Sequence, residues 1–307
     1  MQIYNNNSGK LEQIKETWFA LERYMQKLTE DNMENIFWLE FIKTEFQLNN
    51  LRIDSLAFDN ESNSFVIIEY KRWSSYSVID QWMSYLALML NNKADFVQVL
   101  WKKRNSFIDI KSIDWSQSKI IIIADSFNRY QKESINFKDL AIDLWELKQF
   151  NDWTIVFNTI KASNTTESIK TVTKFETGEF KKVNSEIKTY DEKFHLKWTD
   201  NDIIEIYEDL KSFILNLNSN IEIIYKKVYI AFKFNKRNLV DIWIWKWVIT
   251  LWINLKKWEL KDINNIMEDI SNKWHHWNWD YWVKITNQNK LFEIKDLIKQ
   301  AYDIYNK

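Results

Sequence analysis

The stretches LRIDSLAFD (51–59) and SFVIIEYKR (64–72) decide the fold of the first half of this chain. Both are rich in the β-branched and aromatic residues typical of strands, and the turn-forming NESN separates them, so the pattern predicts a β-hairpin. Side chains two positions apart in a strand lie on the same face. The face that begins with the apolar Phe65 and Ile67 therefore ends in Glu69 and Lys71.

A charged pair at the end of an apolar strand face is costly unless the charges are paired, hydrated or bound to a metal. Asp54 on the preceding strand is the third member of the group, because cross-strand neighbours come within reach of one metal ion. Two carboxylates, a backbone carbonyl and water form the oxygen site that Mg²⁺ prefers, and Mn²⁺ is an alternative. Lys71 would orient or deprotonate a water molecule, or neutralise charge on a phosphate. A purely structural cross-strand charge network that includes Arg52 stays open.

The surrounding pattern indicates an α/β domain over residues 1–160. Helical periodicity in residues 11–43 precedes the hairpin, and SVIDQWMSYLALML (77–90) returns to it afterwards. KIIIIA (119–124) has the composition of a buried strand. Two further strands are expected, at DLWELKQF (143–150) and TIVFNTI (154–160).

The order RID (52–54), hairpin, IIEYK (67–71) and a helix containing QxxxY resembles the PD-(D/E)XK phosphodiesterase superfamily. The resemblance implies a restriction-endonuclease-like αβββαβ core. It also implies that Asp54 and Glu69 bind the metal, that Tyr70 lends its backbone carbonyl, and that Lys71 serves the attacking water.

Further residues enter only through this resemblance. A glutamate on the first helix often joins the site in the family, and Glu22 in LERYMQ is the best match, with Glu40 a weaker one. Gln81 and Tyr85 match the helix motif, and their i,i+4 spacing places them on one helical face. Taken alone, Glu22 is a solvated helix position and the Gln81–Tyr85 pair an ordinary helix-surface pair. Ile53 replaces the proline of the family name.

Residues 161–195, rich in Ser, Thr, Lys and Glu, are expected to be a linker. Residues 196–307 predict an α+β domain with a mainly antiparallel sheet: helices at 202–217, 260–270 and 291–305, four alternating strands, and a short strand at 280–285. Four motifs mark this part: IYEDL (206–210), KKVYIAFKF (226–234), LWINLKK (251–257) and NKWHHWNWDYWVKI (272–285). With them it resembles a bacterial domain of unknown function found in proteins called "predicted transport protein". Its basic residues form either a phosphate-facing patch or a solvated sheet edge. They are Lys226, Lys227, Lys233, Lys236 and Arg237.

Composition excludes several chemistries. The formal net charge of −1 provides no global basic field, so contact with nucleic acid must rest on a local patch. With no cysteine and three histidines, thiolate nucleophiles and Cys-ligated zinc are excluded, and His275 and His276 are interpreted as surface-loop residues. The run Lys102 to Arg104 is interpreted as exposed loop charge rather than a phosphate contact. No apolar run long enough for a membrane span occurs, which predicts a soluble, cytoplasmic protein.

Tryptophan stands where glycine is expected. The chain has 18 Trp and 2 Gly, whereas average usage of about 7% would give roughly 20 glycines. We hypothesise that the gene comes from a bacterial lineage that reads UGA as glycine, and that it was translated here with UGA as tryptophan; the alternative is an unusually Trp-rich protein. Trp115, Trp145 and Trp252 lie in strand-like or anchoring contexts and are interpreted as genuine. UGA codons are expected at Trp38, Trp73, Trp82, Trp153, Trp258, Trp274, Trp277 and Trp279.

The function expected from these features is a Mg²⁺-dependent nuclease that acts on DNA in defence, restriction or repair. The alternative is a non-catalytic module that keeps the nuclease fold and binds nucleic acid or protein. An intact set of Asp54, Glu69 and Lys71 favours the first. The sequence leaves open DNA against RNA, sequence specificity, the role of the second domain, and whether a homodimer forms to cut two strands.

Overall fold

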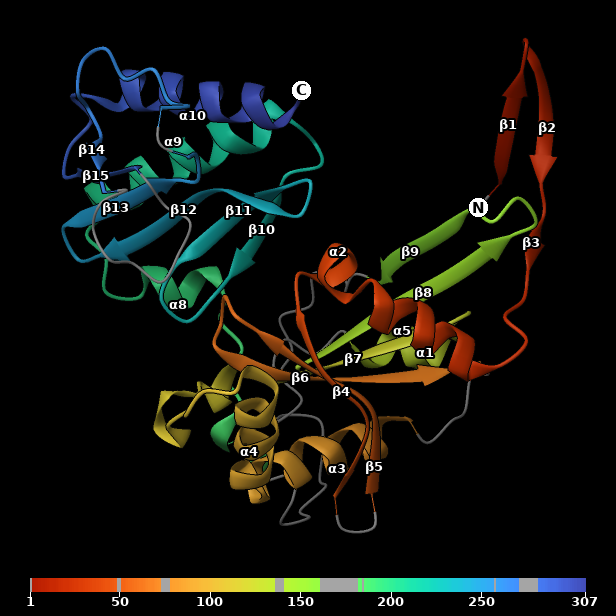
Figure 1. Cartoon of the computed structure of the whole chain (residues 1–307). Helices are drawn as coiled ribbons and strands as arrows, with labels where there is room; N and C mark the ends of the chain where they lie inside the picture. The colour runs from red at the N-terminus through yellow and green to blue at the C-terminus, as the bar shows by residue number, and fades with distance from the viewer. Residues whose placement is uncertain are drawn as a thin grey trace. The chain divides into compact units, whose positions relative to one another are not determined.

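The computed structural model describes residues 2–48, 51–72, 78–135, 141–160, 182–183, 185–256, 258–270 and 281–307 (Figure 1). The chain divides into two compact units, Met1–Thr189 and Tyr190–Lys307. The boundary falls inside the stretch expected as a linker. Val183 and Ile187 from that stretch are buried in the core of the first unit, whereas the residues from Tyr190 onward belong to the second unit.

The first unit is built on a seven-stranded mixed sheet, in the order β3-β8-β7-β6-β5-β4 with β9 paired to β8. β4, β5 and β6 are antiparallel neighbours, and β6, β7 and β8 run parallel. Helices α1 and α2 precede β4, and α3 and α4 connect β6 to β7, which gives the expected restriction-endonuclease-like αβββαβ core. The strands are β3 (Glu16–Thr17), β4 (Glu40–Leu48), β5 (Leu51–Asp59), β6 (Ser64–Lys71), β7 (Lys119–Ala124), β8 (Ile142–Phe150) and β9 (Ile155–Ile160). The helices are α1 (Glu22–Asp31), α2 (Met33–Phe37), α3 (Val78–Asn91), α4 (Lys93–Arg104) and α5 (Arg129–Ser134).

The helical interpretation of residues 11–43 was wrong at both ends. β1 (Ile3–Asn7) and β2 (Lys10–Ile14) form a two-stranded sheet of their own, which stands away from the rest of the unit in Figure 1. At the other end, residues from Glu40 onward belong to β4. Leu11 and Ile14 have helical spacing by coincidence, and Leu11 is exposed rather than part of an amphipathic face.

The predicted hairpin is the β5–β6 pair, called here the carboxylate hairpin. The side chains of β6 alternate between two hydrophobic cores, as the strand period requires. Phe65 and Ile67 pack on the side of α3 and α4. Val66, Ile68 and Tyr70 pack on the side of α1 and α2. Both faces of β6 are covered, so its register is fixed. A slip of one residue would move Glu69 and Lys71 to the face that packs on α1 and α2.

The second unit is a six-stranded antiparallel sheet, in the order β10-β11-β12-β13-β15-β14. Side chains of α9 and α10 form one core with the sheet, and Figure 1 shows both helices on the same face. This is the predicted α+β domain. The strands are β10 (Glu222–Tyr225), β11 (Ile230–Phe234), β12 (Arg237–Trp245), β13 (Val248–Ile253), β14 (Glu268–Asp269) and β15 (Tyr281–Ile285), and the helices are α8 (Glu192–Leu196), α9 (Asn201–Leu217) and α10 (Leu291–Tyr305).

The helix expected at 260–270 does not form. Asp262 Oδ2 accepts a hydrogen bond from the backbone N–H of Met267 at 2.7 Å, Asn265 adopts a positive φ of 50°, and Glu268 starts β14. Aspartate side chains that bond nearby backbone groups compete with helix hydrogen bonding. This competition produces a turn where apolar spacing alone indicated a helix.

Three tryptophans have left-handed backbone conformations: Trp38 at φ 59°, Trp153 at φ 68° and Trp258 at φ 74°. A bulky residue at positive φ is a conformational outlier, whereas glycine adopts it freely. Trp38 is the C-cap of α2, a position at which glycine dominates. The three indoles are 48%, 82% and 84% exposed, so little packing compensates the backbone strain.

Other tryptophans have the anchoring contacts expected of genuine ones. Trp115 stacks on Phe65 with ring centroids 5.5 Å apart, and Trp145 meets Phe37 edge-on at 5.0 Å. Trp73, Trp274, Trp277 and Trp279 lie outside the described residues, as does the side chain of Trp82.

Candidate metal-binding and catalytic site

The carboxylate hairpin holds Asp54 and Glu69 in a reciprocal arrangement. The backbone N–H of Asp54 donates to Glu69 Oε1 at 3.2 Å, and the backbone N–H of Tyr70 donates to Asp54 Oδ2 at 3.1 Å. Each carboxylate is thus fixed by the backbone of the opposite strand. This geometry follows from the antiparallel register of the hairpin. Ser55 pairs with Ile68, so Asp54 and Glu69, the next residue on each strand, lie opposite each other.

Both carboxyl groups are strongly desolvated. Glu69 is only 2% exposed, and burial together with the nearby charge of Asp54 raises the pKa of Glu69 to about 8. Burial also raises the pKa of Asp54, and the Tyr70 N–H and the Lys71 ammonium offset only part of the effect. Two neighbouring buried carboxyls cannot both ionise cheaply without a compensating cation. The pair therefore retains a proton near neutral pH.

Lys71 lies at the end of β6 beside this pair. Its Nζ is 3.6 Å from Glu69 Oε2, and its side chain is 32% exposed while that of Glu69 is nearly enclosed. The ammonium therefore stands between the buried carboxylates and solvent, where it can reach a phosphate approaching from outside. Its single charge lowers the pKa of Glu69 but does not outweigh burial.

Helix α3 brings Tyr85 to the same site. Its phenol donates to the backbone carbonyl of Arg52 at 3.1 Å. Burial raises the pKa of Tyr85, and the charges of Glu69 and Asp54 raise it further, which places the phenol within their field. Gln81 lies in α3 one turn earlier, but its side chain is outside the described residues.

Glu22 reaches the end of β6 without joining the carboxylate pair. Its Oε1 accepts from the backbone N–H of Arg72 at 2.9 Å. Among the described residues, no group of three or more His, Asp or Glu side chains is placed to hold a metal. Glu40 is on β4 and is bound to Arg104 and Asn60.

The residues present fit a divalent cation with oxygen ligands. Asp54 and Glu69 are adjacent and desolvated, and the charges of Lys71 and Arg52 do not offset the burial of the pair. A divalent ion would supply the missing charge and displace the retained proton. Asp54 and Glu69 would hold such an ion, with the carbonyl of Tyr70 as a third protein ligand.

Sequence reasoning did not single out Asp125, whose charged neighbours are Arg72 and Lys148 rather than the carboxylate pair. It directly follows β7, whose last residue Ala124 pairs with Lys71 in the parallel β6. Burial raises the pKa of Asp125, and its Oδ1 is buried without a hydrogen-bond partner. A carboxylate at the carboxyl end of a buried strand was the available signal, because parallel strands end at a common edge of the sheet.

The basic candidates of the second unit lie towards the two ends of β11. Lys226 and Lys227 precede β11, whereas Lys233, Lys236 and Arg237 lie around its far end. The strand separates the two groups by roughly 15–20 Å at about 3.3 Å per residue. Arg104 is paired with Glu40. His275 and His276 lie outside the described residues.

Comparison with known proteins bears on both units. Residues 192–305 match the family model "Domain of unknown function (DUF5655)". A solved EndoMS–dsDNA2 complex is 20% identical and covers 42% of this chain and 47% of its own, with a TM-score of 0.27. A repair endonuclease from Pyrococcus abyssi is 18% identical and covers 43% of this chain and 50% of its own, also with a TM-score of 0.27. The class of fold follows from the strand order of the first unit.

Strand order gives the first unit a restriction-endonuclease-like fold, and the second unit contains the residues that match the DUF5655 model. An uncharacterized protein of Haemophilus influenzae (strain ATCC 51907 / DSM 11121 / KW20 / Rd) is 44% identical over 301 residues, which is 98% of this chain and 99% of that protein. The chain belongs to the same family as this Haemophilus influenzae protein. No helix among the described residues is long and apolar enough to cross a membrane.

Proposed function

We propose that this protein is a metal-dependent nuclease that hydrolyses phosphodiester bonds of DNA. The observation that carries the proposal is the carboxylate hairpin, which holds Asp54 and Glu69 in mutual backbone contact with Lys71 3.6 Å from Glu69. Desolvating two carboxylates beside one lysine destabilises the fold unless the site binds a cation. A metal-binding role accounts for that arrangement.

The chemistry divides among the residues by position. Asp54 and Glu69 would hold Mg²⁺ or Mn²⁺, and the bound ion would polarise the phosphate and lower the pKa of the attacking water. Lys71 would hold that water or stabilise the charge that develops on the phosphate. Tyr85 stays protonated because its pKa is raised, so its phenol would keep donating to the Arg52 carbonyl and hold β5 beside the site.

The roles of Glu22, Gln81 and the second unit are part of the same proposal. Glu22 fixes the backbone at Arg72, immediately after Lys71, and would bring its carboxylate to the site when metal and substrate are bound. Gln81 would act from the same helix face as Tyr85, because residues four apart in a helix are neighbours. The DUF5655 unit would bind the substrate or a partner protein.

The test is incubation of the protein with circular and linear DNA in Mg²⁺, Mn²⁺ or EDTA, next to two lysine variants. Lys71→Ala is expected to abolish cleavage, with at least a hundredfold loss of rate, because loss of one electrostatic stabiliser typically costs about 10²–10³ in rate. Lys43→Ala, an exposed lysine of β4, should cleave like the wild type.

Cleavage that needs metal and disappears in Lys71→Ala alone supports the nuclease. Absence of cleavage of both DNA and RNA, together with nucleic-acid or protein binding that survives Lys71→Ala, would reject it in favour of a non-catalytic binding module.

A further inference from the structure

Helix α1 presents a row of polar side chains to the carboxylate hairpin. Glu22, Gln26 and Glu30 are spaced by four residues, so they lie on one helical face. We call these three residues the polar stripe. Glu22 bonds the backbone at Arg72, and the other two members bond β5 at and beside Asp54. The stripe therefore contacts the hairpin where its carboxylates are.

Gln26 makes the contact nearest the site. Its Nε2 donates to the backbone carbonyl of Asp54 at 2.8 Å. The same nitrogen lies 3.0 Å from Glu30 Oε1 and 3.1 Å from Thr44 Oγ1. An amide nitrogen has only two protons, so these acceptors share them. One partly buried side chain thus ties α1 to both β4 and β5.

Glu30 and Ser55 continue the contact into the buried side of the hairpin. Ser55 Oγ donates to Glu30 Oε1 at 2.6 Å and lies 3.3 Å from the Tyr70 hydroxyl. Ser55 is fully buried, and Tyr70 is 1% exposed. Ser55 follows Asp54 and Tyr70 follows Glu69, so this network fixes the residue next to each carboxylate.

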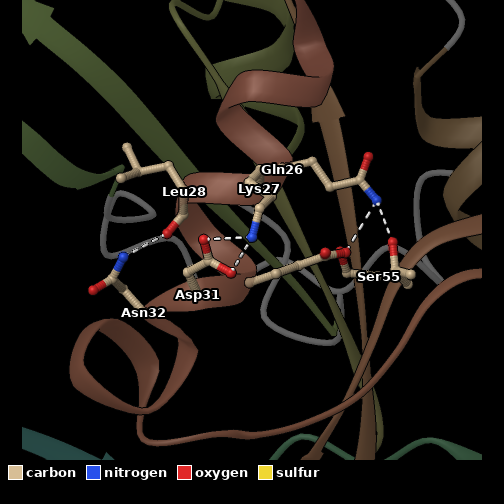
Figure 2. Close-up of polar contacts among 8 residues, drawn as sticks. Gln26, Lys27, Leu28, Asp31, Asn32 and Ser55 are labelled. Atoms are coloured by element: carbon tan, nitrogen blue, oxygen red, sulfur yellow. Dashed lines mark hydrogen bonds and ion pairs between the residues drawn. The ribbon is translucent and has the colours of Figure 1, made fainter.

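Figure 2 shows two adjacent residues of α1, Gln26 and Lys27, that point to different partners. Gln26 extends from α1 towards the segment that carries Ser55, while the adjacent Lys27 turns to Asp31 on the helix itself. The Lys27–Asp31 pair is an exposed i,i+4 contact at 2.6 Å. Of these two adjacent residues, Gln26 therefore contacts the hairpin, whereas Lys27 pairs only with another residue on the surface of the helix.

The side of the hairpin matters for the chemistry. Ser55 and Tyr70 face α1, whereas Glu69 and Lys71 are on the opposite face of β6. Gln26 acts on Asp54 only through the backbone, so it cannot be a metal ligand in this arrangement. It can set where the Asp54 carboxylate stands, and metal sites depend on such outer partners for orientation of their ligands.

We infer that Gln26 is a positioning residue, which together with Glu30 and Ser55 fixes the backbone of Asp54 and thereby sets the divalent-metal affinity of the carboxylate pair. The inference rests on the proposed function, since it assumes that Asp54 and Glu69 bind the ion. It goes beyond that proposal because Gln26, which is not expected to touch the metal, is given a role in metal affinity.

The test measures binding of Mn²⁺ alone by calorimetry, well below the unfolding temperature of each variant. Gln26→Leu keeps a side chain of similar bulk and removes the donor, and it is expected to weaken Mn²⁺ binding by about tenfold or more, the range for loss of an outer partner of a metal ligand. Lys27→Ala is the matched control and should bind Mn²⁺ like the wild type. Asp54→Asn should lose binding.

Ser55→Ala provides a second, smaller perturbation in case Gln26→Leu does not fold. It leaves Glu30 without its short hydrogen bond, and a loss of several-fold in Mn²⁺ affinity is expected, with unchanged circular dichroism. A docking role alone would lower the unfolding temperature without changing the affinity of the folded protein.

The outcomes distinguish failure of the positioning role from failure of the proposed nuclease function. Wild-type Mn²⁺ affinity in both folded variants, with binding lost in Asp54→Asn, would overturn the positioning role and leave the metal site intact. Absence of Mn²⁺ binding and of cleavage in the wild type would overturn both.

Discussion

At the scale of single residues, the carboxyl group of Glu69 is the most perturbed part of the candidate site. Its environment combines burial, a neighbouring acid and one lysine 3.6 Å away. Perturbed acids of this kind concentrate at functional sites, although structural ion networks also produce them. Glu69 is held by the backbone N–H of Asp54 on the opposite strand and by Lys71.

The stability of the metal-free protein should therefore fall as pH rises. The pKa of Glu69 is raised from 4.5 to about 8 in the folded state, so between these values the folded state holds a proton that the unfolded state has released. The favourable contribution is complete below pH 4.5 and is lost as pH approaches 8. The slope can reach about 1.4 kcal/mol per pH unit for one proton.

Urea unfolding in EDTA at several pH values between 5 and 8 measures this dependence. Glu69→Gln cannot ionise and should show a shallower decline, while Glu34→Gln, an exposed position on α2, should behave like the wild type. Equal slopes in all three proteins would mean that Glu69 does not hold the proton.

The tryptophans at positive φ give a second prediction at this scale. Trp38→Gly, Trp153→Gly and Trp258→Gly should each stabilise the protein by about 1 kcal/mol, since a strained non-glycine backbone costs about 1–3 kcal/mol. Trp145→Gly should instead destabilise it by about 3 kcal/mol or more, because it empties a site packed against Phe37.

Urea unfolding measures both effects, and the gene provides an independent check. UGA codons at Trp38, Trp153 and Trp258 would support the hypothesis that glycine is the natural residue there. UGG codons, or a loss of stability in all three glycine variants, would refute it.

At the scale of elements, β12 shows how the second unit tolerates a buried charge. Asp241 is fully buried in this strand. It accepts hydrogen bonds from Nδ2 of Asn238 at 3.0 Å and from Nδ2 of Asn254, after β13, at 2.8 Å. A buried carboxylate is acceptable only when its oxygens are bonded. The two amides therefore link Asp241, in the middle of β12, to positions near the start of β12 and just after β13.

Removing one of these amides should destabilise the sheet. Asn254→Ala is expected to lower the free energy of unfolding by about 2 kcal/mol, because it takes a hydrogen bond from a buried charge. Asn289→Ala, in the exposed turn before α10, should change stability by less than about 0.5 kcal/mol. Thermal or urea unfolding of the two variants tests the difference, and equal effects would show that Asp241 does not depend on Asn254.

At the scale of the whole molecule, the candidate chemistry and the matched domain of unknown function occupy different units. Asp54, Glu69, Lys71 and Tyr85 all belong to the first unit, and the DUF5655 match belongs to the second. The formal net charge of −1 offers no general attraction to DNA. Binding would therefore depend on local groups such as Lys71, rather than on a field spread over the protein.

The sequence alone determined the hairpin, the pairing of Asp54 with Glu69 and Lys71, and the α/β and α+β character of the two units. These features depend on short-range rules, since the strand period of two and the turn residues fix which side chains share a face. It also predicted glycine at eight tryptophan positions, and three of these have the positive φ that favours glycine.

Only the tertiary structure decided which distant residues meet the hairpin. Gln26 carries no local sequence signal for a role at the site, because its neighbours come from α1 packing on β5. Side-chain competition at Asp262 likewise replaced an expected helix with a turn. Contacts between segments far apart in the chain depend on how whole elements pack, and local periodicity does not encode them.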